Sequence, residues 1–308
     1  MANFDISGIV QGLHDARQQW RQAHRPATGE VRGIEFPSRD ALAAIVGQLK
    51  GVLFPMRLGP TGLRQESEEF HVAHALDSAL HALLRQVEIE LKYSAALQQL
   101  TSADSAGQAL AATQAFGAAL PGIRTMLDSD VLAAYQGDPA ARSVDEVLLC
   151  YPGILAMIHH RLAHCLYKLG LPLLARIVGE LAHAETGIDI HPGATIGAGF
   201  FMDHGTGIVI GETAVIGQHV RLYQAVTLGA KRFTTLADGS LQKGQPRHPV
   251  VEDDVVIYAG ATVLGRITIG KGAVIGGNVW VTHDVAPGAR VAQAAAREDG
   301  GNGHGDAA

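Results

Sequence analysis

Cysteine and basic charge are both scarce in this chain of 308 residues. Cys150 and Cys165 are the only cysteines, which are too few for a disulfide scaffold and indicate a reducing compartment. Lys and Arg number 24 against 30 Asp and Glu, so the excess of basic charge typical of a nucleic-acid-binding protein is missing. The sequence has no run of about 20 apolar residues that could span a membrane, and residues 1–10 do not resemble a secretory signal. We therefore expect a cytoplasmic protein that binds neither nucleic acid nor membrane.

Glycine, by contrast, is abundant and unevenly distributed. Residues 1–186 contain 15 of the 37 glycines, residues 187–288 contain 18, and the last twenty residues contain 4. Glycine does not recur at every third position, which excludes a collagen repeat, and a hydrophobic content of 47% excludes bulk disorder. The gradient predicts two regions of different architecture.

The first 186 residues have the spacing of amphipathic helices. Apolar residues recur at intervals of three and four over 4–23, 39–50, 67–98, 107–118 and 142–182. Ser67, which precedes two glutamates, and Asp138, which precedes a proline, have the features of helix N-caps. We predict an α-helical N-terminal domain over residues 1–186.

From residue 188 the period becomes six residues, which neither a helix nor a plain strand produces. Chance spacing in a strand-rich domain would not place an aliphatic residue at every one of these positions, so we predict a left-handed parallel β-helix over residues 187–290. The fold class is thus α + β, with helices first and a hexapeptide solenoid second. The aliphatic positions are Ile190, Ile196, Met202, Ile210, Ile216, Leu222, Leu228, Val251, Ile257, Val263, Ile269, Ile275 and Val281.

Two interruptions break this period. The step from Met202 to Ile210 is two residues too long, and the step from Leu228 to Val251 holds residues 231–249. A solenoid coil has no place in its core for such an insertion, so the second interruption predicts a protruding loop. Long loops on regular scaffolds are usually functional.

The chain has fifteen histidines, and two groups of them are candidates for a metal site. His160 and His164 share one face of a predicted helix, where packing is the simpler explanation for them. A zinc site between coils would resemble the γ-type carbonic anhydrases, which need an HxxxxH pair. The histidines of the predicted solenoid contain no such pair, so we expect no bound metal. These histidines are His191, His204, His219, His248 and His283.

His204 differs because it lies inside the first interruption, between Asp203 and a Gly-Thr-Gly segment. Asp189 precedes it by fifteen residues, three short of one coil of eighteen, and neighbouring coils stack at about 4.8 Å. A carboxylate at that distance could orient the imidazole as a general base. The aspartates could equally cap backbone amides in turns. The spacing alone leaves both interpretations open.

Residues 137–293 resemble the serine acetyltransferase family, which makes O-acetylserine for cysteine biosynthesis. The resemblance covers about half of the chain, and residues 1–130 share only a helical character with the family. It rests on Gly137-Asp-Pro-Ala140, Tyr151-Pro-Gly153, His160-Arg-Leu-Ala-His164, Asp189-Ile-His-Pro192, Asp203-His-Gly-Thr-Gly-Ile-Val-Ile-Gly-Glu-Thr213, Tyr223-Gln-Ala-Val-Thr-Leu-Gly229 and Arg247-His-Pro249.

The resemblance implies a role for each candidate site residue. His204 would be the general base and Asp189 its orienting partner. Asp203, Asp138, Arg247 and His248 would bind serine, with acidic groups for the ammonium and the guanidinium for the carboxylate. Asp138 could also remain a helix cap.

The family also implies a co-substrate and an assembly. Acetyl-CoA would lie in a groove between neighbouring coils of a homotrimer, along the backbone of Gly229, Ala259 and Gly260. Serine would attack the thioester directly, without an acyl-enzyme. Two trimers could pair through their helical domains.

Other functions remain open on the sequence alone. A hexapeptide acetyltransferase for a sugar or antibiotic hydroxyl would use the same base with a different pocket. A γ-carbonic-anhydrase-like metal enzyme is a further alternative, and a purely structural solenoid would have no reason to break its repeat at His204.

Two features depart from the family pattern. Relatives that bind O-acetylserine sulfhydrylase use a C-terminal isoleucine, whereas residues 291–308 form a Gly-rich segment ending in Ala307-Ala308. We expect this tail to be disordered and do not expect that complex. Ala225 and Ala230 replace glycines of many relatives, a mild change.

Overall fold

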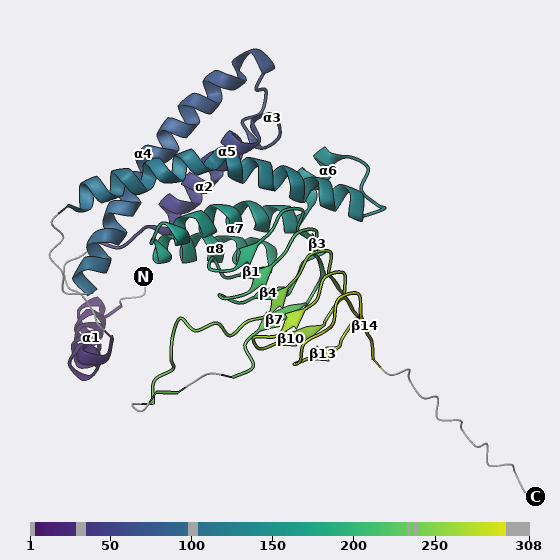
Figure 1. Ribbon diagram of the computed structural model, residues 1–308. Coiled ribbons are helices and arrows are strands. Elements are labelled where there is room, and N and C mark those ends of the chain that lie inside the picture. The colour runs from purple at the N-terminus through teal and green to yellow at the C-terminus, as the bar shows by residue number, and fades with distance from the viewer. Residues whose placement is uncertain (1–3, 29–34, 98–103, 233–234, 237–238, 294–308) are drawn as a thin grey trace, which may run out of the picture.

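The computed structural model describes residues 4–28, 35–97, 104–232, 235–236 and 239–293, and it shows helices followed by a parallel β-solenoid (Figure 1). This order confirms the predicted fold class. None of the described helices is long and apolar enough to cross a membrane. The tail predicted to be disordered begins at residue 291, but Val291 belongs to the last strand, where it pairs with Ile275. Residues 294–308 of that tail lie outside the described residues.

The helices occupy most of the chain up to residue 186. They are α1 (Ile6–Thr28), α2 (Arg39–Leu53), α3 (Pro55–Leu58), η1 (Gln65–Ser67), α4 (Glu68–Leu97), α5 (Ser105–Gly137), α6 (Val144–Cys150), α7 (Pro152–Lys168) and α8 (Pro172–Thr186).

Local signals set most of the helix boundaries. The predicted helix over 142–182 is three helices, because Pro152 and Pro172 each begin a new one. The predicted helix over 107–118 instead continues past Pro121 to the end of α5. Ser67 does not cap α4, since its hydroxyl donates to the carbonyl of Arg64 at 3.0 Å.

Fourteen short strands follow in the described part of the chain. They are β1 (Asp189–Ile190), β2 (Thr195–Ile196), β3 (Phe201–Asp203), β4 (Val209–Ile210), β5 (Val215–Ile216), β6 (Arg221–Tyr223), β7 (Thr227–Gly229), β8 (Val250–Val251), β9 (Val256–Ile257), β10 (Thr262–Leu264), β11 (Thr268–Ile269), β12 (Val274–Ile275), β13 (Trp280–Val281) and β14 (Arg290–Val291).

Three parallel sheets form the walls of the solenoid. We call them sheet A (β1-β4-β7-β10-β13), sheet B (β2-β5-β8-β11) and sheet C (β3-β6-β9-β12-β14). All thirteen aliphatic residues of the six-residue period are buried, with at most 6% of their surface exposed. The strand register places them directly above one another, so each coil continues the same apolar core.

A buried ion pair joins the helices to the first coil. Arg161 of α7 contacts Asp130 of α5 through two hydrogen bonds of 2.6 and 2.7 Å. The same guanidinium donates to the carbonyls of Ile196 and Gly197 at 3.2 and 2.9 Å. Asp130 also accepts the backbone N–H of Phe200 at 2.9 Å. These contacts fix α5 and α7 against the solenoid end that carries His204.

The second interruption of the repeat is a loop that leaves the solenoid between β7 and β8 (Figure 1). Its described part contains one antiparallel bridge, between Thr235 and Leu241. Arg247 and His248 lie at its end, directly before β8.

Candidate active site

The corner between β3 and β4 presents His204 to solvent. His204 has a φ of 58° and Gly205 one of 84°, so the extra residues turn the chain through the left-handed region. The His204 side chain is 72% exposed, and its Nε2 lies 3.9 Å from Oδ1 of Asp203. A Cβ on Gly205 would lie 2.5 Å from Cδ1 of Ile188. Glycine at this position therefore lets the corner close against the preceding coil.

Asp138 reaches this corner from the helical region. It is the C-cap of α5, so the prediction that it begins a helix is wrong; Ser143 caps the next helix instead. Its carboxylate accepts the hydroxyl of Tyr151 at 2.5 Å and the N–H of Ala140 at 2.8 Å. These two bonds, with smaller contributions from nearby cationic groups, lower the pKa of Asp138. The carboxylate is thus held ionised.

Tyr151 had no role in the sequence analysis, although the resemblance includes its Tyr-Pro-Gly segment. It directly precedes α7, and its hydrogen bond to Asp138 raises its own pKa to about 12. The phenol therefore remains a hydrogen-bond donor throughout the neutral range. Tyr151 orients one oxygen of the Asp138 carboxylate.

Arg221 is a second residue that the sequence did not reveal. Its guanidinium carbon lies 5.0 Å from the centroid of the Phe201 ring. A Cβ on Gly137 would lie 2.0 Å from Nη2 of Arg221, so the guanidinium packs directly on the C-terminal turn of α5. A cation there is favourable for the helix dipole. We call Asp138, Tyr151, Asp203, His204 and Arg221 the base corner.

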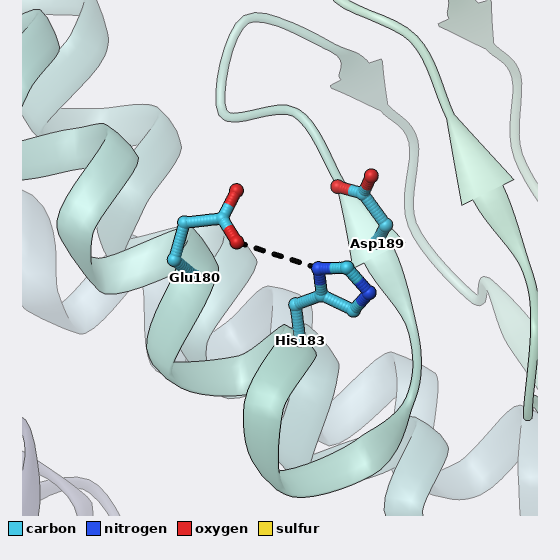
Figure 2. A group of neighbouring side chains, drawn as sticks. All are labelled: Glu180, His183 and Asp189. Atoms are coloured by element: carbon cyan, nitrogen blue, oxygen red, sulfur yellow. Dashed lines mark hydrogen bonds and ion pairs between the residues drawn. The ribbon is translucent and has the colours of Figure 1, made fainter.

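Within the single chain, Asp189 lies apart from the base corner, in another group of side chains. Its carboxylate lies with Glu180 and His183 of α8, with the ligand atoms of all three within 4.8 Å of one another (Figure 2). His183 Nδ1 is 3.4 Å from the Glu180 carboxylate. This is the one group in the described part of the chain whose side chains are close enough to share a metal ion. No hydrogen bond or ion pair between described residues joins Asp189 to His204.

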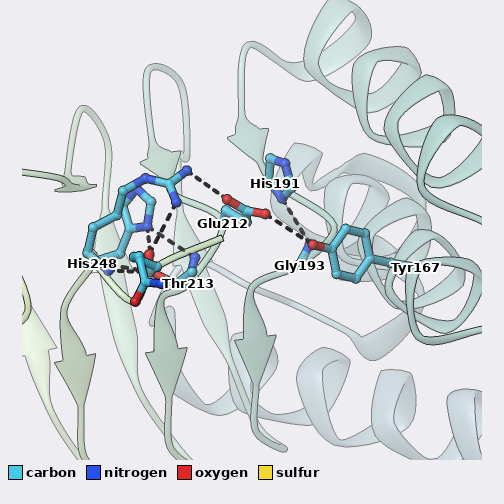
Figure 3. A network of polar contacts seen from close by, with 8 residues as sticks. Tyr167, His191, Gly193, Glu212, Thr213 and His248 are labelled. Atoms are coloured by element: carbon cyan, nitrogen blue, oxygen red, sulfur yellow. Dashed lines mark hydrogen bonds and ion pairs between the residues drawn. The ribbon is translucent and has the colours of Figure 1, made fainter. Parts of the chain in front are cut away.

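His248 belongs to a network at another corner, between β4 and β5, together with Glu212 and Thr213 (Figure 3). Arg247 joins this network through Glu212. Arg247 Nη2 donates to Glu212 at 2.7 Å, and Glu212 also accepts the hydroxyl of Tyr167 at 3.1 Å. Burial acts to raise the pKa of Glu212, but these hydrogen bonds outweigh it and the pKa is lowered. An ionised Glu212 thus holds the guanidinium in place. We call Tyr167, Glu212, Thr213, Arg247 and His248 the arginine corner.

Thr213 determines the tautomer of His248. The Thr213 hydroxyl oxygen accepts the N–H groups of Arg247 and His248 at 2.9 and 3.2 Å. Its own proton is then available to His248 Nδ1 at 2.9 Å, which also accepts the Thr213 N–H at 3.1 Å. Nδ1 is therefore an acceptor, and the imidazole proton lies on Nε2.

His248 is also held neutral. Only 6% of the residue is exposed, and burial, aided by the neighbouring Arg247, lowers the pKa of His248 to about 4. A Cβ on Gly211 would lie 2.0 Å from Cδ2 of the ring, so the imidazole rests on bare backbone. The network thus presents one fixed N–H donor.

The two corners lie on different edges of the solenoid. The base corner follows sheet C and precedes sheet A, whereas the arginine corner lies between sheets A and B. No hydrogen bond or ion pair among the described residues joins them. One chain therefore brings Asp138, Asp203 and His204 together and separates them from Arg247 and His248.

The three residues expected to line the acetyl-CoA groove also lie on two different edges of the solenoid. Gly229 ends β7 at the edge between sheets A and B, where its carbonyl accepts the N–H of Gly265 at 3.0 Å. Ala259 and Gly260 precede β10 at the edge of the base corner. Gly260 has a φ of 69°, and a Cβ there would lie 2.2 Å from Oδ1 of Asn278. Glycine is favoured at this turn because a side chain in left-handed backbone would meet Asn278.

Comparison with known proteins gives consistent results. Residues 248–283 match the family model "Bacterial transferase hexapeptide (six repeats)". A plasmid serine acetyltransferase of Synechococcus elongatus is 57% identical over 267 residues, which are 86% of this chain and 84% of that protein. The Bacillus subtilis serine acetyltransferase is 49% identical over 160 residues, 52% of this chain and 70% of that protein.

Solved structures agree with these relatives. Serine acetyltransferase 1 of Entamoeba histolytica in complex with L-cysteine superposes with a TM-score of 0.70 at 37% identity, covering 81% of this chain and 86% of that chain. The Neisseria gonorrhoeae serine acetyltransferase in complex with serine has a TM-score of 0.53 at 29% identity, covering 84% and 97%. By its sequence, its solenoid and its relatives, the chain belongs to the serine acetyltransferase family.

Proposed function

We propose that this protein transfers the acetyl group of acetyl-CoA to the hydroxyl of L-serine and releases O-acetyl-L-serine and CoA. The observation that carries the proposal is the exposed His204 imidazole beside two carboxylates, at the first of the two interruptions of the repeat. Serine is the acceptor named for the relatives. A zwitterionic acceptor needs charges of both signs, and a neutral sugar does not.

The acceptor pocket in this proposal takes one charge from each corner. Asp138 and Asp203 receive the ammonium group, and Arg247 receives the carboxylate. Arg247 uses one N–H on Glu212 and another on the carbonyl of Gln245. The guanidinium has five N–H groups, so donors remain for a substrate carboxylate.

A homotrimer would bring the two corners together. Each subunit has one edge with the base corner and another with the arginine corner, and a three-fold axis can place unlike edges face to face. Pairing of two trimers through the helices is a further part of the proposal. We also propose a cytoplasmic location, supported by Cys150 and Cys165, which are both free thiols in the structure.

The chemistry needs a base because a serine hydroxyl is a weak nucleophile near neutral pH. In the proposed reaction His204 accepts the hydroxyl proton while the oxygen attacks the thioester carbonyl. The C–O bond forms, the C–S bond breaks from the tetrahedral intermediate, and His204 returns the proton to the thiolate of CoA. General base catalysis of this kind contributes about 10²–10⁴ in rate.

Two further side chains, those of Asp189 and His248, assist the proposed reaction. Asp189 orients His204 when the corner is packed against a neighbouring subunit, and the fixed Nε2–H of His248 donates to a substrate oxygen. The backbone of Gly229, Ala259 and Gly260 lines the donor groove. The reaction as written requires no metal ion.

The test measures thiol release from acetyl-CoA with L-serine, homoserine, sugars or no acceptor. We expect release to depend on L-serine. His204→Ala should lower kcat by about 10²–10⁴ while the oligomeric state and acetyl-CoA binding are unchanged. His219→Ala is the matched control, because His219 is another solenoid histidine with positive φ, 56°. Wild-type rates in His204→Ala, or equal rates with sugars, would refute the proposal.

A further inference from the structure

Two tyrosines stack on the outer face of sheet C. Tyr223 ends β6 and Tyr258 directly follows β9. Their ring centroids are 4.9 Å apart and their planes differ by 13°. The strand register pairs Leu222 with Ile257, so the next residues along, Tyr223 and Tyr258, lie one coil apart. The coil spacing of about 4.8 Å matches the separation of the rings.

This pair continues a row that starts at the base corner. The register of β3 and β6 places Asp203 directly opposite Tyr223. Met202, Leu222 and Ile257 point into the core, so by alternation the residue after each points outward. The row Asp203, Tyr223, Tyr258 therefore runs along the solenoid axis for two coil spacings, about 10 Å.

Beyond Tyr258 the row of outward side chains ends. The register of β9 and β12 pairs Ile257 with Ile275, so the position that follows Tyr258 in the row is Gly276, which has no side chain. Tyr258 is 43% exposed, and its hydroxyl makes no hydrogen bond to any described residue. Its ring thus offers an uncovered surface directly before Ala259 and Gly260.

Tyr223 is held more firmly than Tyr258. Arg221 Nη1 donates to the Tyr223 hydroxyl at 3.3 Å, and Arg221 is itself packed on α5 beside Asp138. Among the described residues, the stack with Tyr223 is the contact that positions the Tyr258 ring. The fixed ring supports the exposed one.

We propose that Tyr258, supported by Tyr223, is a positioning residue for the acyl donor and contacts the pantetheine arm of acetyl-CoA. The inference rests on the proposed function, which places the thioester at His204. A donor that extends from there along the solenoid axis passes over the row. The methylene and amide groups of the arm suit the flat faces of aromatic rings.

The experiment compares Tyr258→Ala, which removes the ring, with Tyr258→Phe, which keeps it. We expect Tyr258→Ala to raise the KM for acetyl-CoA about 3- to 10-fold and to leave kcat and the KM for serine within about twofold. Tyr258→Phe should behave as wild type. S-acetylpantetheine as donor should show the same increase, because the contact is to the arm. Phe70→Ala, at an aromatic residue of α4 that is 78% exposed, is the control and should change nothing.

Three results would overturn the inference. The first is an unchanged KM for both donors in Tyr258→Ala. The second is an increase with acetyl-CoA but not with S-acetylpantetheine, which would mean a contact to the nucleotide. The third is a changed oligomeric state in sedimentation, which would mean that the ring contacts a second subunit. A failure of the proposed function is separate from these, because wild-type protein would then release no thiol with serine.

Discussion

Replacing Asp130 by asparagine should destabilise the protein far more than a typical loss of an ion pair. The Asp130 side chain is fully buried and the Arg161 side chain is 7% exposed. Asparagine has nearly the same size and still accepts one hydrogen bond, so it creates no cavity. It does leave the Arg161 charge buried without a counter-ion.

The expected cost is about 3–5 kcal/mol of unfolding free energy, the range for breaking a buried ion pair from one side. The Coulomb attraction is not the origin of this figure, because desolvation offsets most of it when both partners are present. The cost arises because the remaining guanidinium still lacks water. The carbonyls of Ile196 and Gly197 satisfy part of its hydrogen bonding but none of its charge.

The assay is equilibrium urea denaturation followed by circular dichroism, with Asp145→Asn as the matched control. Asp145 pairs with Arg57 on the surface, where their side chains are 57% and 48% exposed. That loss should cost about 0–1 kcal/mol. If Asp130→Asn costs no more than the control, the argument that this pair is buried and isolated from water is wrong.

Three other changes test the two corners. Gly211→Ala should displace the His248 ring, because a Cβ would lie 2.0 Å from it. We expect the free energy of unfolding, measured by thermal denaturation, to fall by about 2 kcal/mol and kcat/KM to decrease. His248 has a folded-state pKa of about 4 against an ordinary 6.5, so it contributes stability above pH 6.5 that is lost as the pH falls toward 4. Between pH 6.5 and 4 the unfolding free energy of wild type, measured by urea denaturation, should therefore fall by about 3 kcal/mol more than that of His248→Asn. The same pH dependence of unfolding free energy in both proteins would contradict this. Tyr151→Phe removes the hydrogen bond that lowers the pKa of Asp138, so the KM for serine should rise about tenfold and the acidic limb of kcat/KM should move to higher pH. An unchanged pH profile would show that Asp138 does not face the substrate.

The six-residue period predicted the core of the solenoid because burial along a regular coil repeats in the sequence. Every aliphatic position of the period is buried. Helix ends were less predictable. The prolines that begin α7 and α8 were visible in the sequence, yet the apolar spacing continues across them. Asp138-Pro139 resembles a cap, but here the long helix α5 ends at that point instead.

The candidate site was only partly predictable, since its contacts join residues far apart in the chain. Asp203 and His204 are neighbours, and the broken period identified them directly. The bond between Thr213 and His248 spans 35 positions, and no periodicity encodes it. Arg221 occupies an outward position of an ordinary repeat, so only its packing against α5 reveals it.

The buried ion pair has a second consequence, which concerns position more than stability. Asp130 and Asp138 lie eight residues apart on the same chain segment, about 12 Å along α5, so the contact that fixes Asp130 to the first coil also sets where Asp138 meets His204. Apolar residues of similar size often replace a buried pair without loss of stability. We therefore expect Asp130→Leu combined with Arg161→Met to recover most of the unfolding free energy that Asp130→Asn loses. The same double variant removes the bond from Arg161 of α7 to Ile196 and the bond from Phe200 to Asp130 of α5. Its KM for serine should therefore stay several-fold above wild type while the KM for acetyl-CoA does not change. If stability and serine affinity recover together, apolar packing alone places α5 and the charges are dispensable for the site.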